Sequence, residues 1–183
     1  MHHVVIIGAG YAGIPAAVRL SRQVRPDEVS ITLVNDSATF VERPRLHQLA
    51  VGQPIRQFRL TDYVGRAGVR VAIARVTGLD LDARQVHTGD GGQLGYDTLV
   101  YALGSNVDLG RIPGAADHAF ALTSPSAAHR LGERLAALPA GAQVTVLGGG
   151  LTGLETVAEI AETYPMLRTR LVSAADPGAR LSA

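Results

Sequence analysis

The fold is decided by ten residues near the N-terminus, Val4-Val5-Ile6-Ile7-Gly8-Ala9-Gly10-Tyr11-Ala12-Gly13. Four β-branched residues in a row are typical of a strand buried on both faces of a parallel sheet. The segment from Ile14 to Arg22 predicts a helix, in which Pro15 is tolerated because a first-turn residue needs no intrahelical N–H bond. Val29 to Val34 predicts a second strand, so this region forms one βαβ unit.

The same unit recurs 140 residues further along the chain. Gln143 to Leu147 predicts a strand, and Gly148-Gly149-Gly150-Leu151-Thr152-Gly153 repeats the glycine spacing. Leu154 to Tyr164 predicts a helix, and Thr169 to Val172 predicts the closing strand. Because each motif stands between a strand and a helix, the repeat favours two dinucleotide-binding turns over two ordinary packing turns.

Each glycine of a G-x-G-x-x-G turn has its own task. The first permits the tight turn, the second lets the backbone approach a pyrophosphate, and the third lets the helix pack closely on the strand. An acid that binds ribose is expected about 20 residues further on. Asn35 stands at this place for the first turn, with Asp36 as the alternative if the register differs by one. Ser173 stands there for the second turn and leaves the choice between NADH and NADPH open.

Short strands are predicted between the two units. They are Val69 to Val76, Arg84 to Thr88 and Leu94 to Tyr101, with a hairpin turn at Asp90-Gly91-Gly92. We interpret them as an antiparallel insertion after the first βαβ unit. Asn106 to Pro113 is typical of a linker, and Ser126 to Leu138 predicts a helix.

Composition excludes several kinds of chemistry. All 17 basic residues are arginine and the formal net charge is +1, which argues against nucleic acid or an anionic membrane as a partner held by bulk charge. With no cysteine and no lysine, the chain supplies no thiolate zinc site, redox dithiol or Schiff base. The histidines have no metal-ligand spacing, so no metal site is predicted. Redox or group-transfer chemistry therefore needs a bound cofactor.

The apolar run from Val4 to Val18 is too short and too rich in glycine for a membrane-spanning helix. It also lacks the basic flank of a secretion signal. We therefore expect a cytoplasmic protein without an integral membrane segment. Peripheral membrane association of a longer form stays open.

Four stretches together resemble the two-dinucleotide-fold flavoproteins of the pyridine nucleotide-disulfide oxidoreductase superfamily. They are Val5 to Leu20, Phe40 to His47, Tyr96 to Ser105 and Val144 to Glu159. The resemblance implies an α/β protein: a Rossmann-like FAD-binding fold with an antiparallel β insertion over residues 1–112, then the first part of a nested Rossmann-like NAD(P)-binding fold over 113–183. Because the chain has no cysteine, it is most similar to the branch of type II NADH dehydrogenases and apoptosis-inducing-factor-like proteins.

The resemblance implies FAD as cofactor, NAD(P)H as co-substrate and hydride transfer through the flavin to a quinone or another small acceptor. FAD contacts are expected from residues of the first fold, and NAD(P)H contacts from the second glycine motif. The FAD set is Gly8, Gly10, Ala12, Gly13, Asn35, Arg43, Val76, Ala102 and Gly104; the NAD(P)H set is Gly148, Gly150 and Gly153.

Three side chains keep more than one interpretation. Glu155 matches a family glutamate near the nicotinamide, or it stabilises the positive end of its helix from the first turn. Arg43 either faces the cofactor or is a solvated loop charge. A histidine after a loop is usually a surface or structural residue, so His47 receives no catalytic assignment.

The chain has 30 residues after Gly153, fewer than the family needs to complete the nested fold. We expect the chain to be the N-terminal part of a longer protein; the alternative is a short protein completed by a partner chain. Two other functions stay open: a flavin-dependent monooxygenase, and a non-catalytic nucleotide-binding or interaction module.

Overall fold

The computed structural model describes residues 1–177. The chain forms two compact units, each made of two separate stretches. The first contains residues 1–41 and 57–105, and the second contains residues 42–56 and the chain from residue 106 onward. The domain boundary after residue 112 stays a prediction. Residues 42–56 are notable because they leave the first unit and pack within the second.

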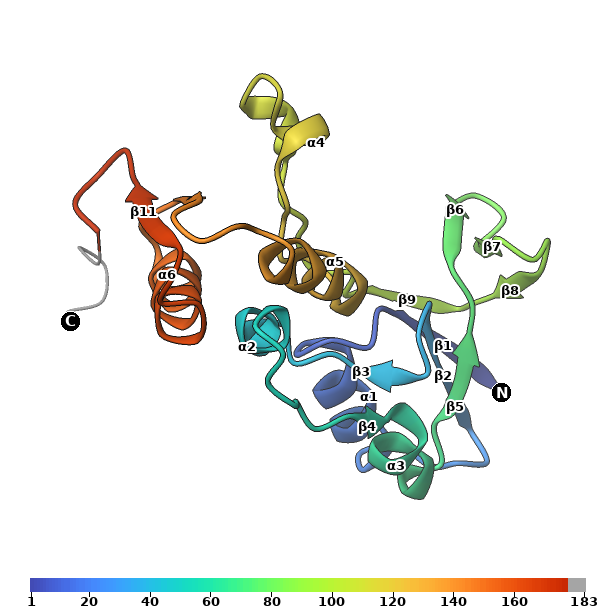
Figure 1. Ribbon diagram of the computed structural model, residues 1–183. Helices are drawn as coiled ribbons and strands as arrows, with labels where there is room; N and C mark the ends of the chain where they lie inside the picture. The colour runs from blue at the N-terminus through green and yellow to red at the C-terminus, as the bar shows by residue number, and fades with distance from the viewer. Residues whose placement is uncertain (178–183) are drawn as a thin grey trace. The chain divides into compact units, whose positions relative to one another are not determined.

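The first unit is built on a four-stranded parallel sheet with the order β5-β2-β1-β9. Its strands are β1 (His2–Ile7), β2 (Val29–Asn35), β5 (Arg70–Ile73) and β9 (Thr98–Tyr101). Helix α1 (Gly13–Ser21) connects β1 to β2 and lies beside the sheet (Figure 1). The predicted β-α-β order of this region is confirmed.

Strand β1 is buried on both faces, as its sequence predicts. Val4 and Ile6 pack in the cluster that contains α1, whereas Val5 and Ile7 pack in a second cluster with Val86. Ile6 and Ile7 have no exposed surface. The strand that carries the first glycine turn is therefore fixed from two sides.

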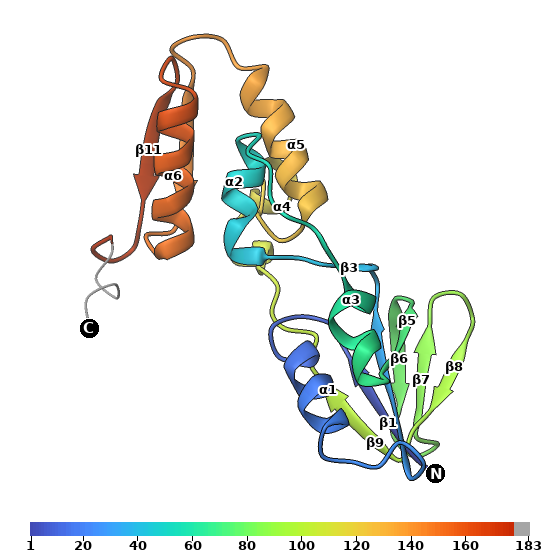
Figure 2. The same ribbon diagram turned by 90° about the horizontal axis from the view of Figure 1, so that it is seen from below.

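The antiparallel insertion is smaller than the sequence predicts. It contains only β6 (Val76–Asp80), β7 (Gln85–Thr88) and β8 (Gln93–Gly95), which form a separate three-stranded sheet (Figure 2). The prediction of one strand from Val69 to Val76 is wrong, because β5 ends at Ile73 and pairs in parallel with β2. The prediction of one strand from Leu94 to Tyr101 is also wrong, because the chain changes sheet near Asp97, whose N–H donates to His3.

The connection from β2 to β5 contains small elements of both units. In the first unit, β3 (Thr39–Phe40) pairs antiparallel with β4 (Phe58–Arg59), and α3 (Leu60–Val64) and the 3-10 turn η2 (Gly65–Ala67) follow. Between β3 and β4, the chain contributes η1 (Arg43–Arg45) and α2 (Leu46–Ala50) to the second unit.

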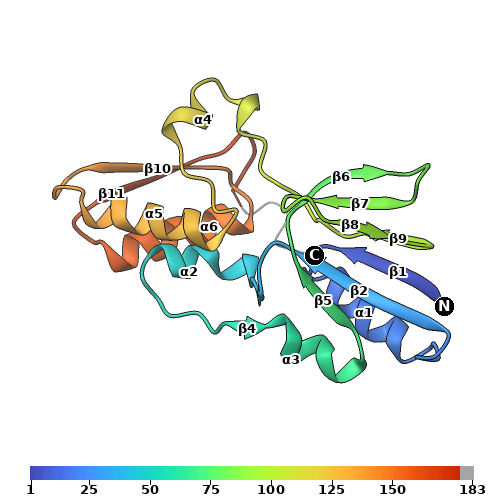
Figure 3. The same ribbon diagram turned by 90° about the vertical axis from the view of Figure 1, so that its right-hand side faces the viewer.

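The second unit has a two-stranded parallel sheet with helices packed on one face. Its later elements are η3 (Leu109–Arg111), α4 (Ala115–His118), α5 (Pro125–Ala136), β10 (Gln143–Leu147), α6 (Leu151–Thr163) and β11 (Arg168–Val172). Alternate residues of β10, Val144 and Val146, pack with Leu135 of α5 and Ile160 of α6. Both helices lie along the same side of β10 and β11 (Figure 3). The predicted second β-α-β order and the helix before it are confirmed, although α6 begins three residues earlier than expected.

Helix α2 packs against both α5 and α6 of the second unit. A Cβ atom on Gly132 of α5 would lie 2.7 Å from the carbonyl oxygen of Ala50, so glycine permits the close approach of α2 and α5. On the side toward α6, Nδ1 of His47 in α2 lies 3.7 Å from Oε2 of Glu155. Within residues 1–177, no helix has the length and apolar character needed to cross a membrane.

Candidate functional site

The first glycine turn connects β1 to α1 with a conformation that requires glycine. Gly8 has a φ of +99°, and its N–H donates to the carbonyl of Val34 at 2.8 Å. A Cβ atom on Gly13 would fall on the carbonyl oxygen of Gly8, so α1 begins in direct contact with the end of β1. A Cβ atom on Gly10, in contrast, meets no atom within 4 Å. The two outer glycines of the turn therefore have no room for a side chain, whereas the middle glycine faces free space.

The end of β9 completes one side of this turn. The N–H of Ala102 donates to the carbonyl of Ile7 at 2.9 Å, which places Ala102 next to the glycine motif. A Cβ atom on Gly8 would lie too close to the carbonyl of Ala102. Gly104 follows with a φ of +73° and is exposed. The structure thus brings Ala102 to the first turn, with Gly104 two residues beyond it.

Asn35 connects the first turn to the end of β2. Its Oδ1 accepts a hydrogen bond from the N–H of Ala9 at 2.9 Å, and its Nδ2 donates to the carbonyl of Ser37 at 2.9 Å. The next residue, Asp36, is exposed. Because an amide oxygen has two lone pairs, Oδ1 can still accept a hydroxyl proton while it holds Ala9.

The second glycine turn repeats the geometry of the first. Gly148 has a φ of +116°, and its N–H donates to the carbonyl of Val172 at 2.8 Å. A Cβ atom on Gly153 would fall on the carbonyl oxygen of Gly148, whereas a Cβ atom on Gly150 would meet no atom within 4 Å. The N–H of Leu154 donates to Gly150 at 3.1 Å, just as that of Ile14 donates to Gly10 at 3.2 Å.

Two predicted residues belong to elements other than those that carry the glycine turns. Val76 begins β6 and pairs with Thr88, and its side chain packs beside the cluster of Val5 and Ile7. Arg43 begins η1 in the second unit and is partly buried. The assignment of both residues to FAD stays a prediction.

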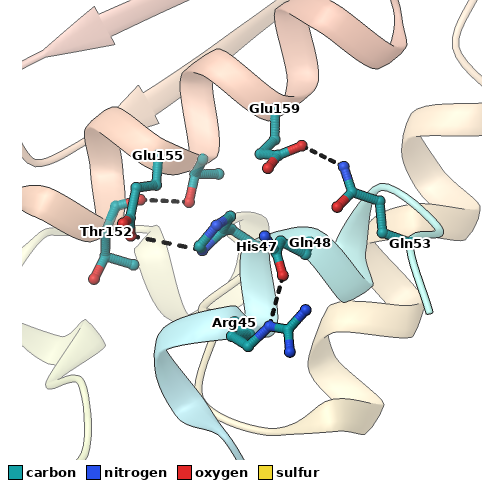
Figure 4. Close-up of polar contacts among 8 residues, drawn as sticks. Arg45, His47, Gln48, Gln53, Thr152, Glu155 and Glu159 are labelled. Carbon is teal, nitrogen blue, oxygen red and sulfur yellow. Dashed lines mark hydrogen bonds and ion pairs between the residues drawn. The ribbon is translucent and has the colours of Figure 1, made fainter. Parts of the chain in front are cut away.

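Glu155 lies in the second turn of α6, because this helix begins at Leu151 and has no acid in its first turn. The prediction that it stabilises the helix terminus from the first turn is therefore wrong, since the effect of the helix dipole decreases within that turn. Its Oε2 instead lies 3.7 Å from Nδ1 of His47 on α2 (Figure 4). His47 is buried with 6% of its surface exposed, and no local sequence pattern predicts this pairing.

The position after β11 carries a small hydroxyl. Ser173 follows the strand directly, and its Oγ accepts from the N–H of Ala175 at 3.4 Å. A Cβ atom on Gly149 would be too close to this hydroxyl, so Ser173 lies against the second glycine turn. No carboxylate occupies the expected ribose position at residue 173.

Both turns satisfy the structural requirements of a pyrophosphate site. In each, the outer glycines are fixed by strand and helix contacts, and the middle glycine leaves a space that a Cβ atom would fill. Each turn leads into a helix N-terminus, where backbone N–H groups and the helix dipole favour a phosphate. The described residues therefore fit two dinucleotides, one at each turn.

Curated proteins similar to this chain include NADH dehydrogenase-type oxidoreductases. The chain is 35% identical over 171 residues to an NADH dehydrogenase-like protein of Mycobacterium tuberculosis, covering 87% of this chain and 42% of that protein. It is 29% identical over 178 residues to a type II NADH:quinone oxidoreductase of Staphylococcus aureus, covering 90% and 44%. The chain thus spans about two fifths of the length of the curated relatives it matches.

Solved structures have the same fold. A ferredoxin reductase of Rhodopseudomonas palustris matches with a TM-score of 0.76 and 24% identity, covering 96% of this chain and 43% of that one. The NDH2 of Plasmodium falciparum, solved with NADH, matches with a TM-score of 0.76 and 17% identity, covering 93% and 41%. The family model for pyridine nucleotide-disulphide oxidoreductases matches residues 2–176. With this match over nearly its whole length, the chain belongs to the pyridine nucleotide-disulphide oxidoreductase family.

Proposed function

We propose that the protein is an FAD-dependent NAD(P)H oxidoreductase, or the N-terminal part of one, that delivers electrons to a quinone-type acceptor. The observation that carries this proposal is the repeated backbone geometry of the two glycine turns. An enzyme that passes a hydride between two dinucleotides needs two such sites. Bound FAD would supply the redox chemistry, accepting a hydride from NAD(P)H and passing electrons to the acceptor.

The first turn would hold the pyrophosphate of FAD. Gly8 and Gly13 set the backbone, and Gly10 leaves room for the phosphates, with Ala12 beside them at the start of α1. The remaining lone pair of Asn35 Oδ1 would accept from the adenosine ribose. Backbone at Val76, Ala102 and Gly104 and the guanidinium of Arg43 would contribute the further FAD contacts.

The second turn would hold NAD(P)H in the same way. Gly148 and Gly153 set the turn, and Gly150 leaves the space for the pyrophosphate. Glu155, two residues beyond Gly153 on the same helix, is similar to a family glutamate near the nicotinamide, and its carboxylate would lie on that side. Ser173 carries no charge to repel a 2′-phosphate, so NADPH as well as NADH is compatible with this turn.

The quinone-type acceptor is supported by the relatives and by the composition. The relative from Staphylococcus aureus is a type II NADH:quinone oxidoreductase. The 183 residues contain no cysteine, so they do not supply a redox-active cysteine pair as the next electron carrier. Direct transfer from the flavin to a small acceptor agrees with both observations.

A spectroscopic titration tests this function. The purified chain is incubated with FAD, passed through a desalting column and examined for the visible bands of a bound flavin. We expect bands that co-elute with the protein and are bleached by NADH without oxygen. A protein that binds no FAD even in excess cofactor would contradict the proposal.

A further inference from the structure

His47 is a buried histidine with an unsatisfied ring nitrogen. Its side chain is 7% exposed, and Nδ1 is shielded from solvent without a hydrogen-bond partner among the described residues. A buried polar atom without a partner is unfavourable, and such an atom often marks a functional contact. The nearest charged group is the Glu155 carboxylate, with 3.7 Å between Nδ1 and Oε2.

Glu155 differs from His47 in its freedom to move. Its side chain is 37% exposed, and it has three rotatable bonds on α6. The imidazole is held by burial in α2. A separation of 3.7 Å exceeds a hydrogen bond and lies within the range of an ion pair, so a small rotation of Glu155 closes the contact. The buried imidazole can therefore favour one position of the more exposed carboxylate.

Several nearby polar side chains of the second unit form ion pairs or hydrogen bonds with one another. On the α2 side, Arg45 lies 3.5 Å from Glu42 and its Nε donates to Gln48 at 2.8 Å. One turn after Glu155 on α6, Glu159 accepts from Nε2 of Gln53 at 2.6 Å (Figure 4).

The hydroxyl of Thr156, beside Glu155 on α6, is also engaged. It donates to the carbonyl of Thr152 at 2.6 Å, within its own helix. It therefore does not donate to the carboxylate that faces His47. The arrangement leaves His47 and Glu155 facing each other between α2 and α6.

We propose that His47 is a positioning residue, which fixes the Glu155 carboxylate beside the second glycine turn. In the imidazolium, and in the tautomer with a proton on Nδ1, the ring nitrogen donates and the carboxylate accepts. The functional consequence rests on the proposed function, because it assumes that the second turn binds NAD(P)H. If the Glu155 side chain is already held in place, NAD(P)H binding does not include the conformational-entropy cost of ordering that side chain.

The pairing itself can be tested without any cofactor. The full chain has six histidines, so the imidazole resonances of His47 must first be assigned in the NMR spectra. They are the resonances that disappear in the His47→Asn variant. We expect Glu155→Gln to move these resonances, because it removes the charge that faces Nδ1. Glu159→Gln is the matched control on the same helix and leaves them in place. Unchanged resonances in Glu155→Gln would overturn the pairing.

The positioning role predicts a pattern of rescue in NADH affinity. The amide nitrogen of asparagine takes about the place of Nδ1, whereas that of glutamine takes about the place of Nε2. We therefore expect His47→Asn to bind NADH nearly as tightly as the wild type. His47→Gln is expected to bind about tenfold more weakly, the effect of one lost hydrogen bond to a charged group.

Two results would distinguish failure of this inference from failure of the proposed function. Equal NADH affinities for His47→Asn and His47→Gln would overturn the positioning role, because packing alone would then explain His47. A wild-type chain that binds no NADH would contradict the proposed function of the second turn. In that case the resonances of His47 in Glu155→Gln still decide whether the pair exists.

Discussion

The side-chain oxygen of Asn35 holds the backbone N–H of Ala9 at 2.9 Å, which ties the first glycine turn to the end of β2. The same side chain donates to Ser37 at 2.9 Å. One residue thus serves the architecture of the turn before any ligand binds. An ionised carboxylate at this position could accept the bond from Ala9 but could not donate one to Ser37.

Replacing Asn35 by alanine is expected to loosen the first turn. The change leaves the N–H of the buried Ala9 without its acceptor, and the expected loss is about 1–3 kcal/mol of unfolding free energy. Urea unfolding of Asn35→Ala measures this value. Asp36→Ala is the control, since its side chain is exposed and a change within about 0.5 kcal/mol is expected. Equal stabilities of the two variants would contradict the structural role of Asn35.

Gly132→Ala is expected to destabilise the second unit, although alanine favours helices. The new Cβ atom would lie 2.7 Å from the carbonyl oxygen of Ala50, so α2 and α5 would have to separate. Overpacking of this kind costs about 1–3 kcal/mol, against about 1 kcal/mol gained in helix propensity.

Thermal unfolding tests this change against Gly65→Ala. Gly65 has a helical φ of −63° and no atom within 4 Å of an added Cβ atom, so its substitution should be neutral or stabilising. A higher melting temperature for Gly132→Ala than for the wild type would contradict the close packing of α2 on α5.

The stability of the first unit is expected to depend on pH through the carboxylate of Asp97. The backbone N–H of His3, 2.6 Å from Oδ2, holds the pKa of Asp97 below its ordinary value of 3.8, and the charges of His2 and Arg84 act in the same direction. A lowered folded-state pKa means that this stabilisation is present above the ordinary value and is lost as the pH falls through the lowered one.

Melting temperatures measured from pH 7 down to pH 3 test this effect. The melting temperature of the wild type should exceed that of Asp97→Asn at neutral pH, and the difference between the two should shrink in acid. A difference that is constant over this range would show that the carboxylate charge of Asp97 does not contribute.

Local patterns predicted the two βαβ units because each is made of neighbouring residues. Val4 to Ile7 carries the signal of a strand buried on both faces, and the glycine spacing specifies the turn after it. The membership of β5 and β9 in the parallel sheet could not be predicted in this way. Their short alternating sequences fit either sheet, and pairing with distant partners decides between the two.

The site was predictable where backbone geometry defines it and not where distant side chains meet. The three glycines of each turn follow from spacing alone. Helix α2 has only five residues, too few to be stable alone, and its packing on α5 and α6 supports it. The pair of His47 and Glu155 joins residues far apart in the chain, and no local pattern reveals such a contact.

The most direct test of the central claim compares valine at the two middle glycines. FAD and NADH affinities are measured by titration for the wild type, Gly10→Val and Gly150→Val, since both positions have open space that the side chain would fill. We predict that Gly10→Val loses FAD and that Gly150→Val keeps FAD but loses NADH. Wild-type FAD binding by Gly10→Val would contradict the assignment of the first turn, and with it the account of a chain that carries two dinucleotides.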